Sequence, residues 1–112
     1  MFASIKEIHA PELAQLLAHK DNDIRVIDVR EAREITAGVI HGADHMPLAS
    51  IPLKLNEIRR EEKVVLVCRS GARSAQACAF LDNQGYEHVY NLRGGMMDWH
   101  RSGLPATEPQ FT

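Results

Sequence analysis

The chain has 112 residues, which is enough for one domain and too few for two of ordinary size. Hydrophobic residues make up 45% of it and charged residues 25%, the composition of a globular protein rather than of a disordered chain. The formal net charge of −2 argues against a dedicated binder of nucleic acid or of an anionic membrane surface.

No targeting or membrane signal stands out in the sequence. No apolar run approaches the roughly 20 residues needed to cross a bilayer, and the N-terminus lacks the basic and apolar regions of a secretory signal. We therefore expect a cytoplasmic protein. The two cysteines, Cys68 and Cys78, are too few for a disulfide scaffold or a thiolate zinc site, so they raise a question of reactivity.

Short apolar runs alternate with helix-like segments along the chain, the pattern of an α/β domain. Leucines at helical spacing behind Pro11 predict an amphipathic helix over residues 10–19. Residues 24–29 are short, β-branched and apolar, which favours a strand buried on both faces of a parallel sheet. Asp28 and Arg30 then lie at the C-terminal end of this strand.

The middle of the chain is less regular. Residues 31–37 are compatible with a short helix, and the glycine and proline content of residues 38–47 predicts a loop. Apolar residues over 51–58 fit a helix imperfectly, because Pro52 permits a helix only within its first turn.

The second half contains the clearest elements. Residues 64–67 predict a buried strand that ends at Cys68, and residues 72–83 are alanine-rich and helix-prone. Gly85 stands where a helix C-terminal cap is expected, and residues 89–92 predict a last short strand.

The end of the chain continues with a glycine pair and a short segment through Trp99 that predicts a helix. We expect one domain over residues 1–106 and a polar tail over residues 107–112.

The segment with the strongest chemical signal is the loop Cys68-Arg69-Ser70-Gly71-Ala72-Arg73-Ser74, between a predicted strand and a predicted helix. Ligands of open α/β sheets bind beyond the carboxyl ends of the strands, and N–H groups at a helix start favour an anion. Gly71 permits a tight turn around the sulfur, and Arg69 and Arg73 add positive charge. Such surroundings lower a cysteine pKa from about 8.5 to roughly 3.5–7.5. We therefore predict that Cys68 is a nucleophile rather than a packing residue.

Cys78 has the opposite surroundings, because alanine, phenylalanine and leucine flank it inside the predicted helix. Packing is its better interpretation. A disulfide with Cys68 is disfavoured, since the intervening helix would separate the two Cα atoms by roughly 10 Å or more, beyond the usual limit of about 7 Å.

Six segments together resemble the single-domain rhodaneses of the sulfurtransferase family, over nearly the whole chain from about Ile5 to Pro105. They are residues 26–31, 38–47, the Cys68 loop, 85–92, 94–99 and 103–105. One such segment would be weak evidence, but six in the family's order and spacing are strong. The resemblance implies a small parallel sheet of four or five strands with helices on both faces. It also implies that Cys68 lies in a shallow open pocket at the carboxyl edge of the strands.

The resemblance further implies a persulfide mechanism. Cys68 would take a sulfane sulfur from an anionic donor such as thiosulfate and pass it to a thiol, to cyanide or to a sulfur-carrier protein. The loop that binds the anion would consist of Arg69, Ser70, Gly71, Ala72 and Arg73, with Asp28, Arg30 and Ser74 in support. Arg73 would make bidentate contacts to the donor. Asp28 and Arg30 would brace the loop, or else form an ordinary salt bridge.

Other functions remain open at this stage. The cysteine phosphatases and arsenate reductases related to this fold place five residues between cysteine and arginine, whereas four separate Cys68 from Arg73. A phosphatase also needs an acid for the leaving group, and no residue recommends itself. A rhodanese fold that only binds partners is disfavoured by the intact cysteine loop, whereas a persulfide relay between proteins is compatible with it.

The remaining motifs are weaker. His41 and His45 have a spacing known from zinc sites, but they lie in a predicted loop without a third ligand. We expect neither a metal nor a cofactor. Met96, Met97 and Trp99 could form an apolar wall beside the site, a docking patch, or part of the core.

Overall fold

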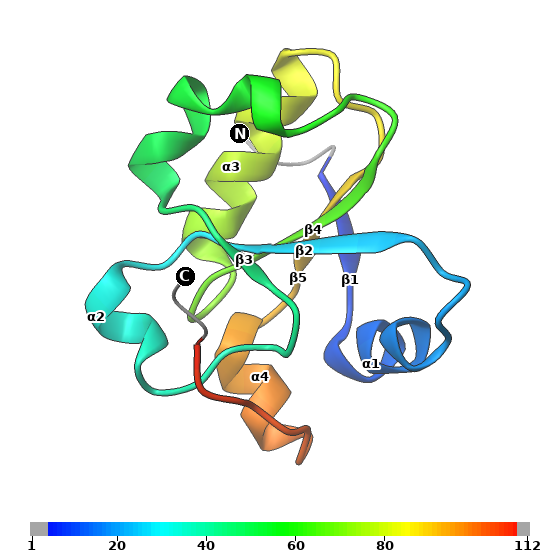
Figure 1. The fold of residues 1–112 in the computed structure, drawn as a ribbon, viewed down its shortest axis with the longest axis vertical. Coiled ribbons are helices and arrows are strands. Elements are labelled where there is room, and N and C mark those ends of the chain that lie inside the picture. The colour runs from blue at the N-terminus through cyan, green and yellow to red at the C-terminus, as the bar shows by residue number, and fades with distance from the viewer. Residues whose placement is uncertain (1–4, 110–112) are drawn as a thin grey trace.

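Five parallel strands form one sheet in the order β1-β5-β4-β2-β3 in the computed structural model, which describes residues 5–109 (Figure 1). The strands are β1 (Lys6–Ile8), β2 (Ile24–Asp28), β3 (Asp44–His45), β4 (Lys63–Val67) and β5 (Val89–Leu92). On the central strand β4, Val64 and Leu66 belong to one buried apolar cluster. Val65 and Val67 belong to a second cluster on the opposite face. This strand is therefore buried on both sides, as its unbroken apolar sequence predicts.

Helices cover both faces of the sheet. They are α1 (Ala10–Ala18), α2 (Ala32–Ile35), α3 (Ala72–Asn83) and α4 (Gly95–Arg101), with two 3-10 helices, η1 (Leu48–Leu53) and η2 (Leu55–Glu57). Figure 1 shows α3 on one side of the sheet and α1 and α4 on the other, and the two apolar clusters divide these elements in the same way. The predicted fold, a parallel α/β sheet with helices on both faces, is confirmed.

The helix over residues 72–83 is confirmed over its whole length, and Gly85 follows it with a φ of +94° that suits a cap. The expected helix over residues 51–58 is wrong, because η1 and η2 replace it. Pro52 lies inside η1, where it has no N–H to donate, and short 3-10 turns tolerate this better than an α-helix does. Leu53 is consequently 84% exposed instead of packed.

Two strands of the sheet are not predicted from the sequence. Strand β1 has three residues, and β3 has two that lie within the predicted loop of residues 38–47. Strands this short carry no readable alternation, and each exists because a longer neighbour, β5 or β2, offers it hydrogen bonds.

The C-terminal segment is in contact with the domain as far as it is described. Thr107 and Val39 exchange backbone hydrogen bonds of 2.8 Å in an antiparallel bridge. Residues 110–112 of the predicted tail lie outside the described residues, and the boundary after residue 106 stays a prediction. Over residues 5–109, no helix combines the length and apolar character that crossing a membrane requires.

Candidate active site

Cys68 directly follows β4 at the carboxyl edge of the sheet, and the start of α4 holds the backbone there. The N–H groups of Met96 and Met97 donate to the carbonyls of Cys68 and Arg69 at 2.9 and 3.0 Å. Gly95 has a φ of +57°, and a Cβ at this position would collide with those same two carbonyls. Only glycine allows the approach, which explains one of the two glycines that open this segment.

The thiol of Cys68 is enclosed by hydrogen-bond donors. Its Sγ accepts from the backbone N–H of Gly71 at 3.0 Å and from the hydroxyl of Ser74 at 3.3 Å. Gly71 has a φ of +100° and turns the chain into α3, so that the start of the helix faces the sulfur. The shallow open pocket implied by the family resemblance is not found at the sulfur itself, since Cys68 is only 1% exposed.

These donors decide the ionisation of the thiol. Burial opposes the thiolate, but hydrogen bonds from the Ser74 hydroxyl and from the backbone amides of Ser74, Gly71 and Ser70 outweigh it. The pKa of Cys68 is therefore lowered from its usual value. The sequence predicts that the two loop arginines contribute to this effect, whereas neutral N–H and O–H donors form the hydrogen bonds with the sulfur.

The sequence predicts that Arg73 binds the anionic sulfur donor, but in the structure its guanidinium is already paired with a carboxylate. Both of its terminal nitrogens donate to the carboxylate of Glu34 in α2, each at 2.7 Å. The Arg73 hydrogen bonds lower the pKa of Glu34 to about 2, so this carboxylate remains charged at neutral pH. The bidentate contact that Arg73 makes in the structure goes to Glu34 and ties α3 to α2, and its contact with a donor stays a prediction.

The other loop residues differ in exposure. Arg69, Ser70 and Ala72 face solvent, whereas Gly71 is buried. The two loop arginines also differ in their ion pairs. Arg73 is paired with Glu34, whereas Arg69 has no acidic partner among residues 5–109.

Asp28 and Arg30 form a buried ion pair rather than a brace for the Cys68 loop. The Arg30 Nη2 lies 2.7 Å from the Asp28 carboxylate and 2.8 Å from the carbonyl of Gly38, to which it also donates. No hydrogen bond joins either side chain to residues 68–73 within the described part of the chain. Because a single residue separates the partners, the pair is satisfied locally, and the Arg30 bond to Gly38 supports the turn that follows α2.

Asn91 is a buried polar residue that the sequence analysis missed. Its Oδ1 lies 2.5 Å from the Ser74 oxygen and shares the single hydroxyl proton with Cys68 Sγ, and its Nδ2 donates to the carbonyl of Gly71 at 3.1 Å. Asn91 is 3% exposed and Ser74 is fully buried, so these bonds are made without competing water. Asn91 on β5 therefore ties together two of the residues that donate to Cys68.

Cys78 lies in the core, one helical turn beyond Ser74. It is 1% exposed, among the same apolar cluster that includes Cys68. Burial, followed by the negative charges of Glu7 and Asp82, raises the pKa of Cys78 to about 12. Both cysteines are free thiols.

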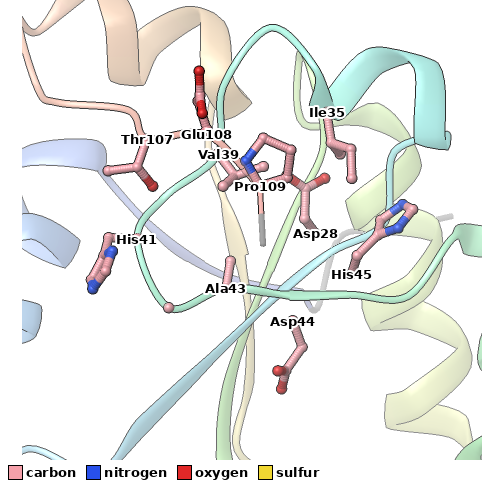
Figure 2. A pocket seen from close by; sticks show the side chains of 11 residues that line it. Asp28, Ile35, Val39, His41, Ala43, Asp44, His45, Thr107, Glu108 and Pro109 are labelled. Carbon is pink, nitrogen blue, oxygen red and sulfur yellow. The ribbon is translucent and has the colours of Figure 1, made fainter. Parts of the chain in front are cut away.

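A pocket at the edge of the sheet next to β3 contains the two histidines of the weak metal motif. Figure 2 shows His41 and His45 well apart, on different sides of this pocket. The Nε2 of His45 lies 2.7 Å from the carbonyl of Arg30, so this ring is already engaged. Nowhere in residues 5–109 do three His, Cys, Asp or Glu side chains gather as metal ligands would.

The apolar residues of α4 fall into two groups, a pair that packs in the core and one methionine that is exposed beside the Cys68 loop. Met96 and Trp99 are buried in the core, at 2% and 3% exposure. Met97 is 42% exposed and lies beside Arg69.

Known proteins similar to this chain agree with the fold. A family model for the rhodanese-like domain matches residues 9–102. A sulfurtransferase of Allochromatium vinosum is 45% identical over 106 residues, which cover 95% of this chain and 98% of that protein. The thiosulfate sulfurtransferase GlpE of Actinobacillus pleuropneumoniae is 36% identical over 78 residues, 70% of this chain and 72% of that protein.

Among solved structures, a rhodanese-like domain protein from Staphylococcus aureus superposes with a TM-score of 0.82 at 32% identity, covering 93% of this chain and all of that one. The chain belongs to the rhodanese-like domain family.

Proposed function

We propose that this protein is a rhodanese-type sulfurtransferase that carries a sulfane sulfur as a persulfide on Cys68. The observation that carries the proposal is the set of N–H and O–H donors around Sγ, which lowers the pKa of a buried thiol. The names of the similar sulfurtransferases support the same reaction class.

The reaction consists of two nucleophilic displacements. The Cys68 thiolate attacks the outer sulfur of an anionic donor such as thiosulfate, the sulfur–sulfur bond of the donor breaks, and its electron pair leaves with sulfite. An acceptor thiolate or cyanide then attacks the outer sulfur of the persulfide, and the thiolate of Cys68 is regenerated. The backbone N–H groups that start α3 stabilise the negative charge in both states, as in an oxyanion hole.

The roles of the two loop arginines differ in this proposal. Arg69 is exposed and has no acidic partner among the described residues, so its guanidinium is available to the anionic donor. Arg73 is held by Glu34 and keeps the start of α3 in place. Arg73 is therefore a positioning residue, and Arg69 takes the donor-binding role.

A phosphatase or arsenate reductase is the weaker candidate. The loop has four residues between Cys68 and Arg73, one fewer than the phosphate cradles of related enzymes. The carboxyl that reaches this loop, Glu34, has a pKa of about 2 and holds no proton for a leaving group near neutral pH.

Thiosulfate treatment followed by intact-mass measurement tests the proposal. We expect a one-sulfur adduct on the wild type and on Cys78→Ser, and none on Cys68→Ser. The proposal is wrong if the wild type shows no adduct or if the adduct survives Cys68→Ser.

The physiological acceptor calls for a second comparison. We propose to measure the rate at which cyanide, dithiols and a sulfur-carrier protein each remove the sulfur from the Cys68 persulfide. Rapid discharge by the protein acceptor alone would favour a relay, whereas rapid discharge by small thiols would favour an independent enzyme.

A further inference from the structure

A hollow adjoins the Cys68 loop between α2 and α4. Arg33 and Glu34 of α2, Arg69 of the loop and Met97 of α4 are among the residues that line it. Arg69 directly follows Cys68 in the chain, so the hollow begins one residue from the sulfur-bearing position, and the backbone N–H of Met97 donates to the carbonyl of Arg69 at 3.0 Å. We call it the α2–α4 hollow.

The charges around the α2–α4 hollow do not cancel. Arg30, which also lines it, is paired with Asp28, and Glu34 is paired with Arg73. Arg33 and Arg69 have no acidic side chain within ion-pair distance among residues 5–109. Two guanidinium charges are therefore left without a partner on a protein whose net charge is negative.

Part of the lining is apolar. Met97 is 42% exposed and is one of two large apolar side chains identified as exposed in the described chain. Ala37, two residues after α2, is exposed on the same hollow. A small inorganic anion would use the arginines and leave this apolar surface uncovered, whereas an organic anion would use both.

We propose that the α2–α4 hollow binds the sulfur acceptor, and that this acceptor is a small organic thiol that bears carboxylates. The inference rests on the proposed function, because it names the second substrate of the same site. Arg33 and Arg69 hold the carboxylates, and Met97 covers the carbon chain between the carboxylates and the thiol.

The chemistry of the second step explains why this site needs positive charge. The acceptor thiolate forms a bond to the outer sulfur of the persulfide, and the bond from that sulfur to Cys68 Sγ breaks. The electron pair stays on Sγ, and the product leaves as the persulfide of the acceptor. Two anions must meet in this step, so unpaired arginines beside them raise the encounter rate.

A series of thiols with different charge tests the proposal. Cysteamine is cationic, 2-mercaptoethanol is neutral, 3-mercaptopropionate carries one carboxylate and mercaptosuccinate carries two. Each discharges Cys68 persulfide preformed with thiosulfate, and the rate constant is expressed per thiolate. We expect the rate to rise along this series, by on the order of fivefold for each carboxylate.

Arg33→Gln should flatten the series, so that the ratio of mercaptosuccinate to 2-mercaptoethanol falls by about fivefold. Arg59→Gln is the control for the loss of one surface charge. Arg59 is also an exposed arginine, with Glu61 and Glu62 at 3.9 Å, but it precedes β4, at the opposite end of the strand from Cys68. We expect the control to keep the wild-type ratio. A flat series in the wild type, or equal losses in both variants, would overturn the proposal.

Alkylation separates this inference from the proposed function. Iodoacetate and iodoacetamide react with the same thiolate of Cys68 but differ by one negative charge. We expect Arg33→Gln, and not Arg59→Gln, to lower the ratio of their rates. If thiosulfate leaves no adduct while this ratio still depends on Arg33, the sulfurtransferase proposal fails and the anion selectivity of the hollow stands. If the adduct forms and neither ratio depends on Arg33, the acceptor site alone is wrong.

Discussion

The two cysteines are buried to the same extent, 1% exposed each, but the pKa values of their thiols are shifted in opposite directions. The pKa of Cys68 is lowered, whereas that of Cys78 is raised to about 12. Burial raises the pKa in both cases, so burial does not explain the difference. What differs is the number of hydrogen-bond donors that reach the sulfur.

The start of a helix differs from its interior in this respect. Cys68 lies before the first turn of α3, where backbone N–H groups have no partner within the helix and are free to face an anion. Cys78 lies inside the same helix, where those groups are already bonded to carbonyls one turn earlier. One helix thus provides a favourable place for a thiolate at its start and an unfavourable one in its middle.

The largest expected effect is a difference in alkylation between the two thiols. With a pKa of about 12, Cys78 is a thiolate in about one molecule in 10⁵ at pH 7, so it should resist iodoacetamide in the folded protein. Cys68 should react readily. Peptide mapping after labelling, with and without denaturant, measures both. Labelling of Cys78 at the rate of Cys68 in the folded state would remove the contrast.

The next effect concerns the support that α4 gives to Cys68. Gly95→Ala should lower the free energy of unfolding by about 2–4 kcal/mol, because the new Cβ collides with the carbonyls of Cys68 and Arg69. Gly103→Ala is the control, since Gly103 also has a positive φ, +73°, but open space around it. About 1 kcal/mol is expected there. Urea unfolding measures both losses, and equal losses would mean that the close approach is unimportant.

Removal of one hydrogen-bond donor should make the ionisation of Cys68 more like that of Cys78. In Ser74→Ala, Sγ loses a hydroxyl that favours the thiolate, so the pKa of Cys68 should rise. The rate of alkylation below the pKa should then fall by on the order of tenfold, the effect of losing one hydrogen bond to a charged group. The pH profile of iodoacetamide labelling measures this shift.

Ser70→Ala is the matched control for that variant. Ser70 assists the thiolate through its backbone amide, which alanine retains. Its pH profile should therefore follow that of the wild type. A shift of equal size in Ser70→Ala would show that the Ser74 hydroxyl has no special role.

The smallest effect concerns the ion pair that ties α3 to α2. The Arg73 hydrogen bonds, followed by one from the backbone N–H of Glu31, lower the pKa of Glu34 from 4.5 to about 2 in the folded state. The charged carboxylate therefore stabilises the fold above pH 4.5, and this contribution is lost as the pH falls toward 2. Both side chains are partly exposed, at 33% and 25%, so solvent screening limits the contribution to about 1 kcal/mol. Glu34→Gln should be less stable than the wild type by this amount at pH 7. The difference in unfolding free energy should shrink below pH 4.5, and a constant difference would contradict the prediction.

The longer elements could be predicted because their signals are local. The strand over residues 64–67 has unbroken apolar character, and the helix over residues 72–83 has its propensity and its glycine cap in consecutive residues. The segment around Pro52 was predicted less well, because proline excludes the α-helix without saying which other backbone replaces it.

The position of the candidate nucleophile was also predictable from the sequence. Cys68 follows a buried strand and precedes a helix, and Gly71 permits the turn between them. These features lie within a few residues of each other, and chain connectivity alone brings them together. The family resemblance, carried by six local segments, has the same origin.

The partners of that loop depended on the tertiary structure. Glu34 meets Arg73 across 39 residues, Asn91 meets Ser74 across 17, and the N–H group of Met96 in α4 reaches the carbonyl of Cys68. No local pattern states which distant side chain will fill a given hydrogen bond, because this depends on how the helices pack on the sheet. The sequence alone therefore determined where the reactive sulfur lies, and packing decided which donors surround it and which arginines remain unpaired beside it.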